Sequence, residues 1–154
     1  MSTPSTPAEA SAAYRRYVSA VLLHGHASAK ACDLGATDLY ALNVLELMGP
    51  MTPGALGVRT GLTTGPTTRL IDRLEAAGYV HRASDAGDRR KVIVEPIGRP
   101  GQLAEVMAAA RQKIGAVLAD YSAEQRAVLF DYFARAADAY QEAAEQLSGR
   151  TTGS

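Results

Sequence analysis

Residues 51–94 read MTPGALGVRTGLTTGPTTRLIDRLEAAGYVHRASDAGDRRKVIV. This stretch decides the fold, because it predicts a short helix, a turn, a second helix and a hairpin in that order. Thr52 before Pro53 is typical of a helix N-cap followed by proline at the first helical position. Gly61 predicts the turn between the two helices, and Gly78 predicts the end of the second one.

The second helix is expected to begin at Thr63 or Thr64 and to bury one apolar side. After it, 79–82 and 91–94 are short segments rich in β-branched residues, which are typical of strands. The polar loop between them contains Asp and Gly, so the two segments predict a β-hairpin with a projecting tip.

Helical periodicity extends on both sides of this stretch. It predicts a long helix from about residue 8 to residue 32 and another that begins after Thr37 as N-cap. Proline and glycine cluster at 96–101 and mark a boundary. Two further helices follow, and the second opens with a capping box formed by Ser122 and Gln125.

The predicted fold is mainly α with a small β-hairpin: a winged helix-turn-helix with long terminal helices. The terminal helices carry apolar stripes that one copy has little core to cover, so they are expected to form a homodimer. The expected segments are disordered tails at 1–8 and 149–154, dimerisation helices at 9–34 and 98–148, and a DNA-binding domain at 35–97.

Composition bounds the class of protein. A chain of 154 residues with 47% hydrophobic and 21% charged residues is globular rather than disordered. Residues 1–7 lack the pattern of a secretory signal, and no apolar run approaches the roughly 18 residues that span a bilayer. Cys32 is the single cysteine, so no internal disulfide can form. We therefore expect a cytoplasmic protein without a membrane partner.

Charge is distributed unevenly along a chain whose net charge is zero. Residues 59–99 hold eight Lys or Arg against five acids, which gives +3. Residues 101–154 hold five against seven, or −2, and residues 1–58 hold three against four, or −1. The central segment is therefore the part expected to face a polyanion.

The central segment resembles the MarR family of bacterial transcriptional regulators. The resemblance is carried by residues 61–80, by Arg82 and by 88–94, which match the family's recognition helix, helix exit and wing in the same order. It implies a homodimer that binds a pseudo-palindromic operator in double-stranded DNA. It also implies a repressor released by a small phenolic or aromatic effector, with no cofactor.

Short polar side chains and arginines share the recognition helix. Small residues let a helix backbone approach the major groove, and arginine can bind guanine bidentately. For Arg73 the alternative is an internal ion pair, with Asp72 or Glu75 of a neighbouring element as the partner. The candidate DNA-binding residues of the helix are Thr63, Thr64, Gly65, Thr67, Thr68, Arg69 and Arg73.

The wing candidates are Asp88, Arg89, Arg90 and Lys91. We expect Arg90 to enter an A·T-rich minor groove and its two neighbours to bind phosphates. Asp88 is expected to orient an arginine through an ion pair. The alternative is a solvated charged turn, which the preceding helix-turn-helix pattern disfavours.

Four aromatic or imidazole side chains, Tyr14, Tyr17, His24 and Tyr40, are candidates for a pocket that binds an aromatic acid. Tyrosines at helical spacing are also typical of a core or a dimer interface. Cys32 is a candidate redox sensor, although a free cysteine is more often a small buried apolar residue.

The sequence carries no nucleotide-binding loop, no nucleophile elbow and no paired carboxylates, so we expect no enzyme activity. No metal site is expected either, because His24 and His26 have no further ligands at suitable spacing. Two alternatives stay open: a winged-helix module that binds proteins, and a DNA-binding regulator without an effector. The successive cations of the wing favour DNA.

Overall fold

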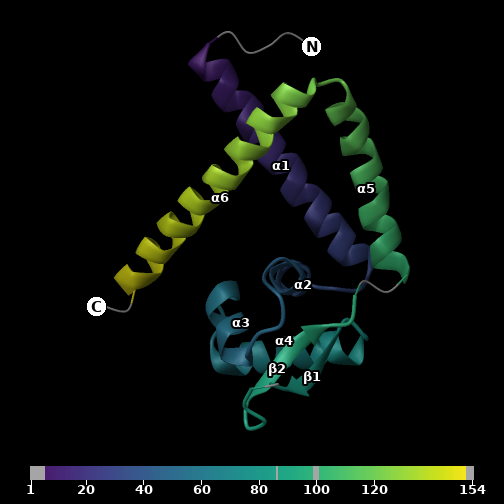
Figure 1. The fold of residues 1–154 in the computed structure, drawn as a ribbon, viewed down its shortest axis with the longest axis vertical. Coiled ribbons are helices and arrows are strands. Elements are labelled where there is room, and N and C mark those ends of the chain that lie inside the picture. The colour runs from purple at the N-terminus through teal and green to yellow at the C-terminus, as the bar shows by residue number, and fades with distance from the viewer. Residues whose placement is uncertain (1–5, 86, 99–100, 152–154) are drawn as a thin grey trace. The chain divides into compact units, whose positions relative to one another are not determined.

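The computed structural model describes residues 6–85, 87–98 and 101–151. It contains six helices and one antiparallel hairpin, as the sequence predicts (Figure 1). The elements are α1 (Pro7–Ala31), α2 (Ala36–Met48), α3 (Pro53–Thr60), α4 (Thr64–Ala76), β1 (Val80–Ser84), β2 (Val92–Pro96), α5 (Gly101–Ala119) and α6 (Ala123–Thr151). The chain divides into two compact units, residues 1–107 and 108–154.

Local signals set most of the helix ends. The Thr52 hydroxyl accepts a hydrogen bond from the backbone N–H of Ala55 (3.2 Å), with Pro53 first in α3. Gly61 has φ +69° and Gly78 has φ +77°, in the left-handed region that glycine tolerates best. These ends match the sequence prediction.

The start of α2 was predicted wrongly. The helix begins after Gly35 and not after Thr37. Glycine has no side chain with which to cap the helix. Asp38 supplies the contact instead, and its Oδ2 accepts a hydrogen bond from the N–H of Gly35 (3.0 Å).

Helical structure reaches into both segments that were predicted as disordered tails, 1–8 and 149–154. At the first end, α1 already begins at Pro7, because Thr6 and Glu9 form a reciprocal capping box. At the other end, α6 continues to Thr151. Its segment 136–147 is rich in Ala, Glu and Gln, which propagate a helix well. Residues 1–5 and 152–154 lie outside the described residues.

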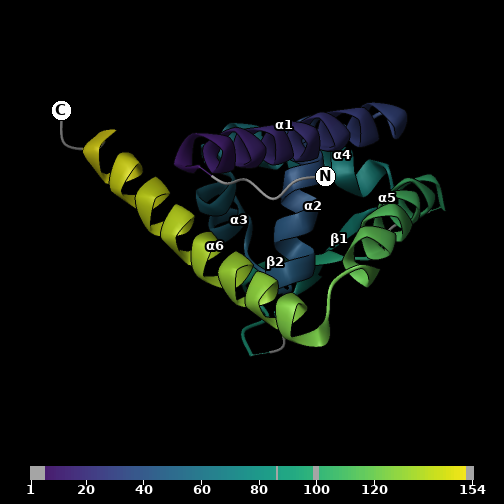
Figure 2. The same cartoon turned by 90° about the horizontal axis from the view of Figure 1, so that it is seen from above.

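The first unit packs its helices and hairpin around one core. Figure 2 shows α1 crossing α2, and Figure 1 shows the hairpin alongside α4 with its loop projecting. Each strand runs one or two residues later than predicted, and Val80 pairs with Pro96 at one end of the ladder. The largest fully buried side chains of this core are Leu42, Leu45, Leu56, Leu70, Ile71, Leu74, Val80, Val94 and Leu103.

The second unit comprises α5 from Ala108 onward, a turn and α6. Ser122 and Gln125 cap α6 reciprocally (2.8 and 3.2 Å), as the sequence predicts. Arg126 donates to the carbonyl oxygen of Tyr121 (2.8 Å), just beyond the end of α5, where a positive charge stabilises the helix dipole. Large apolar side chains on α6 remain exposed, among them Val128 at 70% and Phe130 at 54%.

Candidate nucleic-acid interface

Helix α4 packs closely on α3. A Cβ placed on Gly57 would lie 2.7 Å from Oγ1 of Thr67 and 3.0 Å from the carbonyl oxygen of Leu62, so only glycine allows this approach. Thr67 is 3% exposed, and its hydroxyl donates to the carbonyl oxygen of Thr63 (2.9 Å). The prediction that Thr67 contacts DNA is therefore corrected: this side chain packs between the two helices.

The exposed side of α4 carries the other residues that were predicted to contact DNA, apart from Arg73. Thr63 precedes the helix as its N-cap, and the side chains of Thr64 and Thr68 are exposed. Gly65 is exposed as well, and Arg69 lies one turn after it. The structure therefore brings these five predicted residues to one accessible end of the helix.

Arg73 forms an internal ion pair, which is the alternative given above, but its partner is neither Asp72 nor Glu75. Its Nη2 donates to Oδ1 of Asp38 on α2 (2.6 Å), and its Nε lies 3.4 Å from Oδ2. The Asp38 side chain is 5% exposed, whereas that of Arg73 is 57% exposed. The hydrogen bond to Asp38 raises the pKa of Arg73 above its usual value. Arg73 therefore ties α4 to α2.

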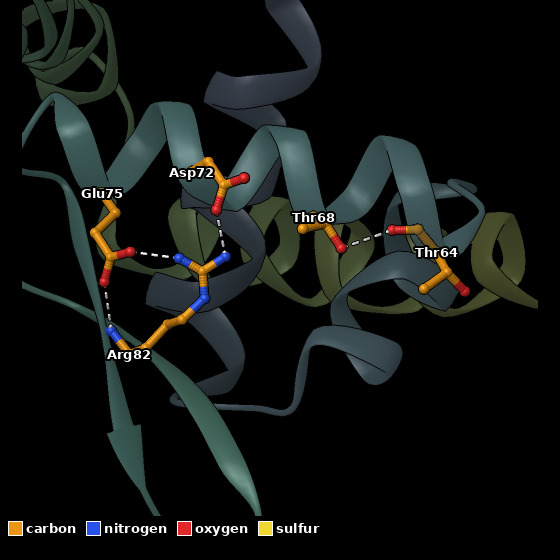
Figure 3. Close-up of polar contacts among 5 residues, drawn as sticks. All are labelled: Thr64, Thr68, Asp72, Glu75 and Arg82. Carbon is orange, nitrogen blue, oxygen red and sulfur yellow. Dashed lines mark hydrogen bonds and ion pairs between the residues drawn. The ribbon is translucent and has the colours of Figure 1, made fainter.

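Arg82 of β1 holds the wing against α4 (Figure 3). One guanidinium nitrogen donates to Asp72 (2.6 Å) and another donates to Glu75. The backbone N–H of Arg82 donates to the other Glu75 oxygen (3.0 Å). The bond to Asp72 is the main cause that raises the pKa of Arg82. The carboxylates predicted as partners of Arg73 thus bind Arg82.

Two aspartates shape the tip of the wing. Oδ1 of Asp85 accepts hydrogen bonds from the backbone N–H groups of Gly87 (2.7 Å) and Asp88 (2.9 Å), and these bonds lower the pKa of Asp85. Oδ1 of Asp88 accepts from the backbone N–H of Arg90 (3.1 Å). The predicted ion pair of Asp88 with an arginine side chain is replaced by this backbone contact.

The three cations of the wing, Arg89, Arg90 and Lys91, are all exposed. Their backbone is ordered by the turn, because the N–H of Lys91 donates to the carbonyl oxygen of Asp88 (2.9 Å). Three neighbouring positive side chains are therefore exposed on one hydrogen-bonded turn, and this arrangement suits a phosphate backbone or a narrow groove.

A third short strand segment anchors the hairpin. Met51 pairs with Val94 through two backbone hydrogen bonds (3.2 and 2.8 Å). Met51 stands directly before the cap of α3, so β2 is tied to the start of the helix-turn-helix. The sequence offered no signal for this pairing.

The four candidates for an aromatic pocket lie on α1 and α2. The hydroxyl of Tyr40 donates to the carbonyl oxygen of Arg59 (3.4 Å), and His24 lies against Ser28 (3.5 Å). None of the four, Tyr14 and Tyr17 included, lines the groove of about 310 Å³ between α3 and α4. The lining residues of that groove are Pro53, Gly54, Gly57, Val58, Leu62, Thr63, Thr64, Thr67 and Thr68.

Cys32 follows the end of α1 and is half-buried against the core. Burial raises the pKa of its thiol, and the charge of Asp33 raises it further. A redox-sensing cysteine is normally exposed and has a lowered pKa. The surroundings of Cys32 therefore favour the alternative of a packed apolar residue.

Within the described ranges, no group of three or more His, Cys, Asp or Glu side chains is placed to hold a metal ion. No helix in the same ranges is both long enough and apolar enough to cross a bilayer.

The sequence interpretation missed two contacts that hold α4, those of Asp38 and of Arg82. Asp38 had a detectable signal, because an acid three residues after Gly35 fits a capping box. Its pairing with Arg73, 35 residues away, had none. The bond of Arg82 to α4 had no periodic signal either, because it joins a strand to a helix across a turn.

Comparison with known proteins identifies related regulators. A MarR family model matches residues 33–91. The uncharacterised HTH-type transcriptional regulator YcgE of Bacillus subtilis is 36% identical over 135 residues, which cover 87% of this chain and 88% of YcgE.

Solved structures share the fold. A MarR family protein from Bacillus stearothermophilus has a TM-score of 0.61 at 24% identity, over 93% of this chain and 99% of that one. Transcriptional regulator Tm0710 from Thermotoga maritima has a TM-score of 0.61 at 23% identity, over 86% and 94%. The similarity to YcgE extends well beyond the helix-turn-helix and over most of both chains. This chain therefore belongs to the MarR family of transcriptional regulators.

Proposed function

We propose that this regulator binds operator DNA with α4 in the major groove and the wing on the adjacent minor groove. The observation that carries the proposal is the pairing pattern of the arginines. Arg73 and Arg82 are held by carboxylates, whereas Arg89 and Arg90 are exposed within the turn of the wing. The internally paired arginines set the geometry and the wing arginines meet DNA.

The proposed DNA-binding form is a homodimer. Leu22 and Leu23 on α1 are 59% and 72% exposed, and Val128 and Tyr132 on α6 are 70% and 55% exposed. Apolar surface of this kind is costly in water and is covered economically by a second copy. A two-fold dimer fits a pseudo-palindrome with half-sites about one helical turn apart.

The proposed control is repression: the dimer occupies a promoter until a small phenolic or aromatic compound releases it. Such a compound must bind the DNA-bound and released forms with different affinity, because otherwise it shifts no equilibrium. The family resemblance supports this step, together with the tyrosines of α1. A regulator without an effector is the outcome if no such compound changes DNA binding.

Selection of duplexes from a randomised library by the full chain tests DNA binding, followed by fluorescence anisotropy on the enriched duplex. We expect enrichment of a pseudo-palindrome. A chain that enriches no sequence at any salt concentration contradicts the proposal and favours a protein-binding winged helix.

Arg90→Ala is expected to weaken binding and to reduce the salt dependence of the affinity by about one ion for each bound wing. The reason is the loss of one exposed cation from the wing turn. Anisotropy titrations over a range of salt concentrations measure both quantities. Lys113→Ala on α5 removes the same charge outside the motif and should change neither. An Arg90→Ala variant that binds like the parent chain would remove Arg90 from the interface.

Light scattering tests the homodimer. We expect a mass near twice the 16.2 kDa of one chain, because the exposed apolar side chains of α1 and α6 need a cover. A 16.2 kDa species at micromolar concentration would contradict the dimer while leaving DNA binding by one copy open.

A further inference from the structure

Few residues of α4 are free to contact bases, because several others are buried or bonded within the protein. Thr64, Thr68 and Asp72 follow one another at intervals of four along one side of the helix (Figure 3). Asp72 is bound by Arg82, and Thr67 is buried. The accessible side of α4 before Asp72 is therefore formed mainly by Thr64, Gly65, Thr68 and Arg69.

The Thr68 hydroxyl is directed toward its own helix. It donates its hydrogen to the carbonyl oxygen of Thr64 (3.0 Å), as Figure 3 shows. A base acceptor such as guanine O6 would have to compete with that bond for the single hydroxyl hydrogen. The Thr68 methyl group makes no such bond and is left as an apolar contact.

The surroundings of Thr68 are also apolar. Thr68 lines the groove between α3 and α4 together with Pro53, Val58 and Leu62. Val58 is 84% exposed, so an apolar side chain stands at the open edge of this groove. A methyl group of a ligand placed beside Thr68 would lose contact with water and gain contact with apolar atoms of the groove.

Gly65 leaves room for such a group. A Cβ added there would meet only Nη1 of Arg69, at 3.8 Å. Internal packing therefore does not require glycine at this position, unlike Gly57. Within one helical turn, Gly65 therefore leaves open space and Thr68 presents a methyl group beside it.

We infer that Thr68 determines sequence specificity by contacting the 5-methyl group of a thymine in the major groove of each half-site. Thymine is the base that presents a methyl group there, and threonine methyls are suitable partners for it. The inference rests on the proposed DNA-binding function and adds the base that this position reads.

The test uses the duplex enriched by the full chain and replaces its thymines by deoxyuridine, one symmetric pair at a time. Deoxyuridine keeps the base pairing and removes only the methyl group. We expect one pair of positions to weaken binding about fourfold per half-site, which corresponds to ~0.8 kcal/mol for one buried methyl. Substitution at the other thymines is the internal control.

Two variants identify Thr68 as the partner of that methyl. Thr68→Ser keeps the hydroxyl and removes the methyl, so it should weaken binding to the thymine duplex and no longer distinguish deoxyuridine at the critical pair. Thr68→Val keeps methyl groups and removes the hydroxyl, so it should retain the preference for thymine. Circular dichroism is the control that checks whether both variants fold as the parent chain does.

The outcomes separate the inference from the function beneath it. If the chain enriches no duplex, DNA binding itself fails and the inference fails with it. If a duplex is bound but no deoxyuridine pair weakens binding, or if Thr68→Ser still distinguishes the two bases, Thr68 does not read a thymine methyl. If Thr68→Val loses the preference while Thr68→Ser keeps it, the hydroxyl is the recognition group.

Discussion

Arg73→Ala is expected to lower the free energy of unfolding by about 2 kcal/mol. Removing one member of a fully buried ion pair costs about 3–5 kcal/mol, because the other charge stays buried without its partner. In the Arg73→Ala variant the charge left behind is Asp38, whose side chain is 5% exposed. Arg73 is 57% exposed, so water already screens part of the pair and the expected cost is smaller.

Urea unfolding followed by circular dichroism, at one fixed protein concentration, measures this cost. Arg69→Ala is the matched control, because it removes an exposed arginine from the same helix and should change stability by less than about 0.5 kcal/mol. If both variants unfold at the same urea concentration, the pair of Arg73 with Asp38 contributes nothing measurable to the fold.

Arg69→Ala is expected to give the largest loss of DNA affinity among the single substitutions, at least about 30-fold. Arg69 is exposed at the accessible end of α4, where a guanidinium can bind guanine O6 and N7 together. Such a contact contributes roughly 1–3 kcal/mol in each half-site, and a dimer makes it twice. Anisotropy titration of the enriched duplex measures the loss.

Arg69→Lys separates base recognition from simple charge. Lysine keeps the positive charge but lacks the planar fork, so it should recover only a small part of the affinity. Full recovery by lysine would assign Arg69 to a phosphate instead of a base. Arg73→Ala is the complementary variant, because it is expected to lower stability more than DNA affinity.

The sequence was most informative where structure depends on neighbouring residues. Thr52 with Pro53, Gly61 and Gly78 each act within one turn of chain, and all three predicted their helix ends. The hairpin was predicted for the same reason, within one or two residues. The MarR-like order of these signals then indicated the family, which the comparisons show.

The sequence was less informative where a contact joins two elements. Helical spacing places Thr67 on the same side as the buried Leu70, Ile71 and Leu74, and this signal was overlooked. The close approach of α3 at Gly57, against which Thr67 packs, had no such signal. Arg73 and Arg82 likewise depend on acids from other elements, and no local pattern reports such partners.

The wing is tied at both of its strands, and this limits how the protein can be regulated. Arg82 ties β1 to α4, and Met51 ties β2 to the chain that enters α3. These contacts join the hairpin to α4 and to the start of α3 within one compact unit. Under the proposed function, a compound that releases DNA is therefore expected to move this unit as a whole instead of lifting the wing alone.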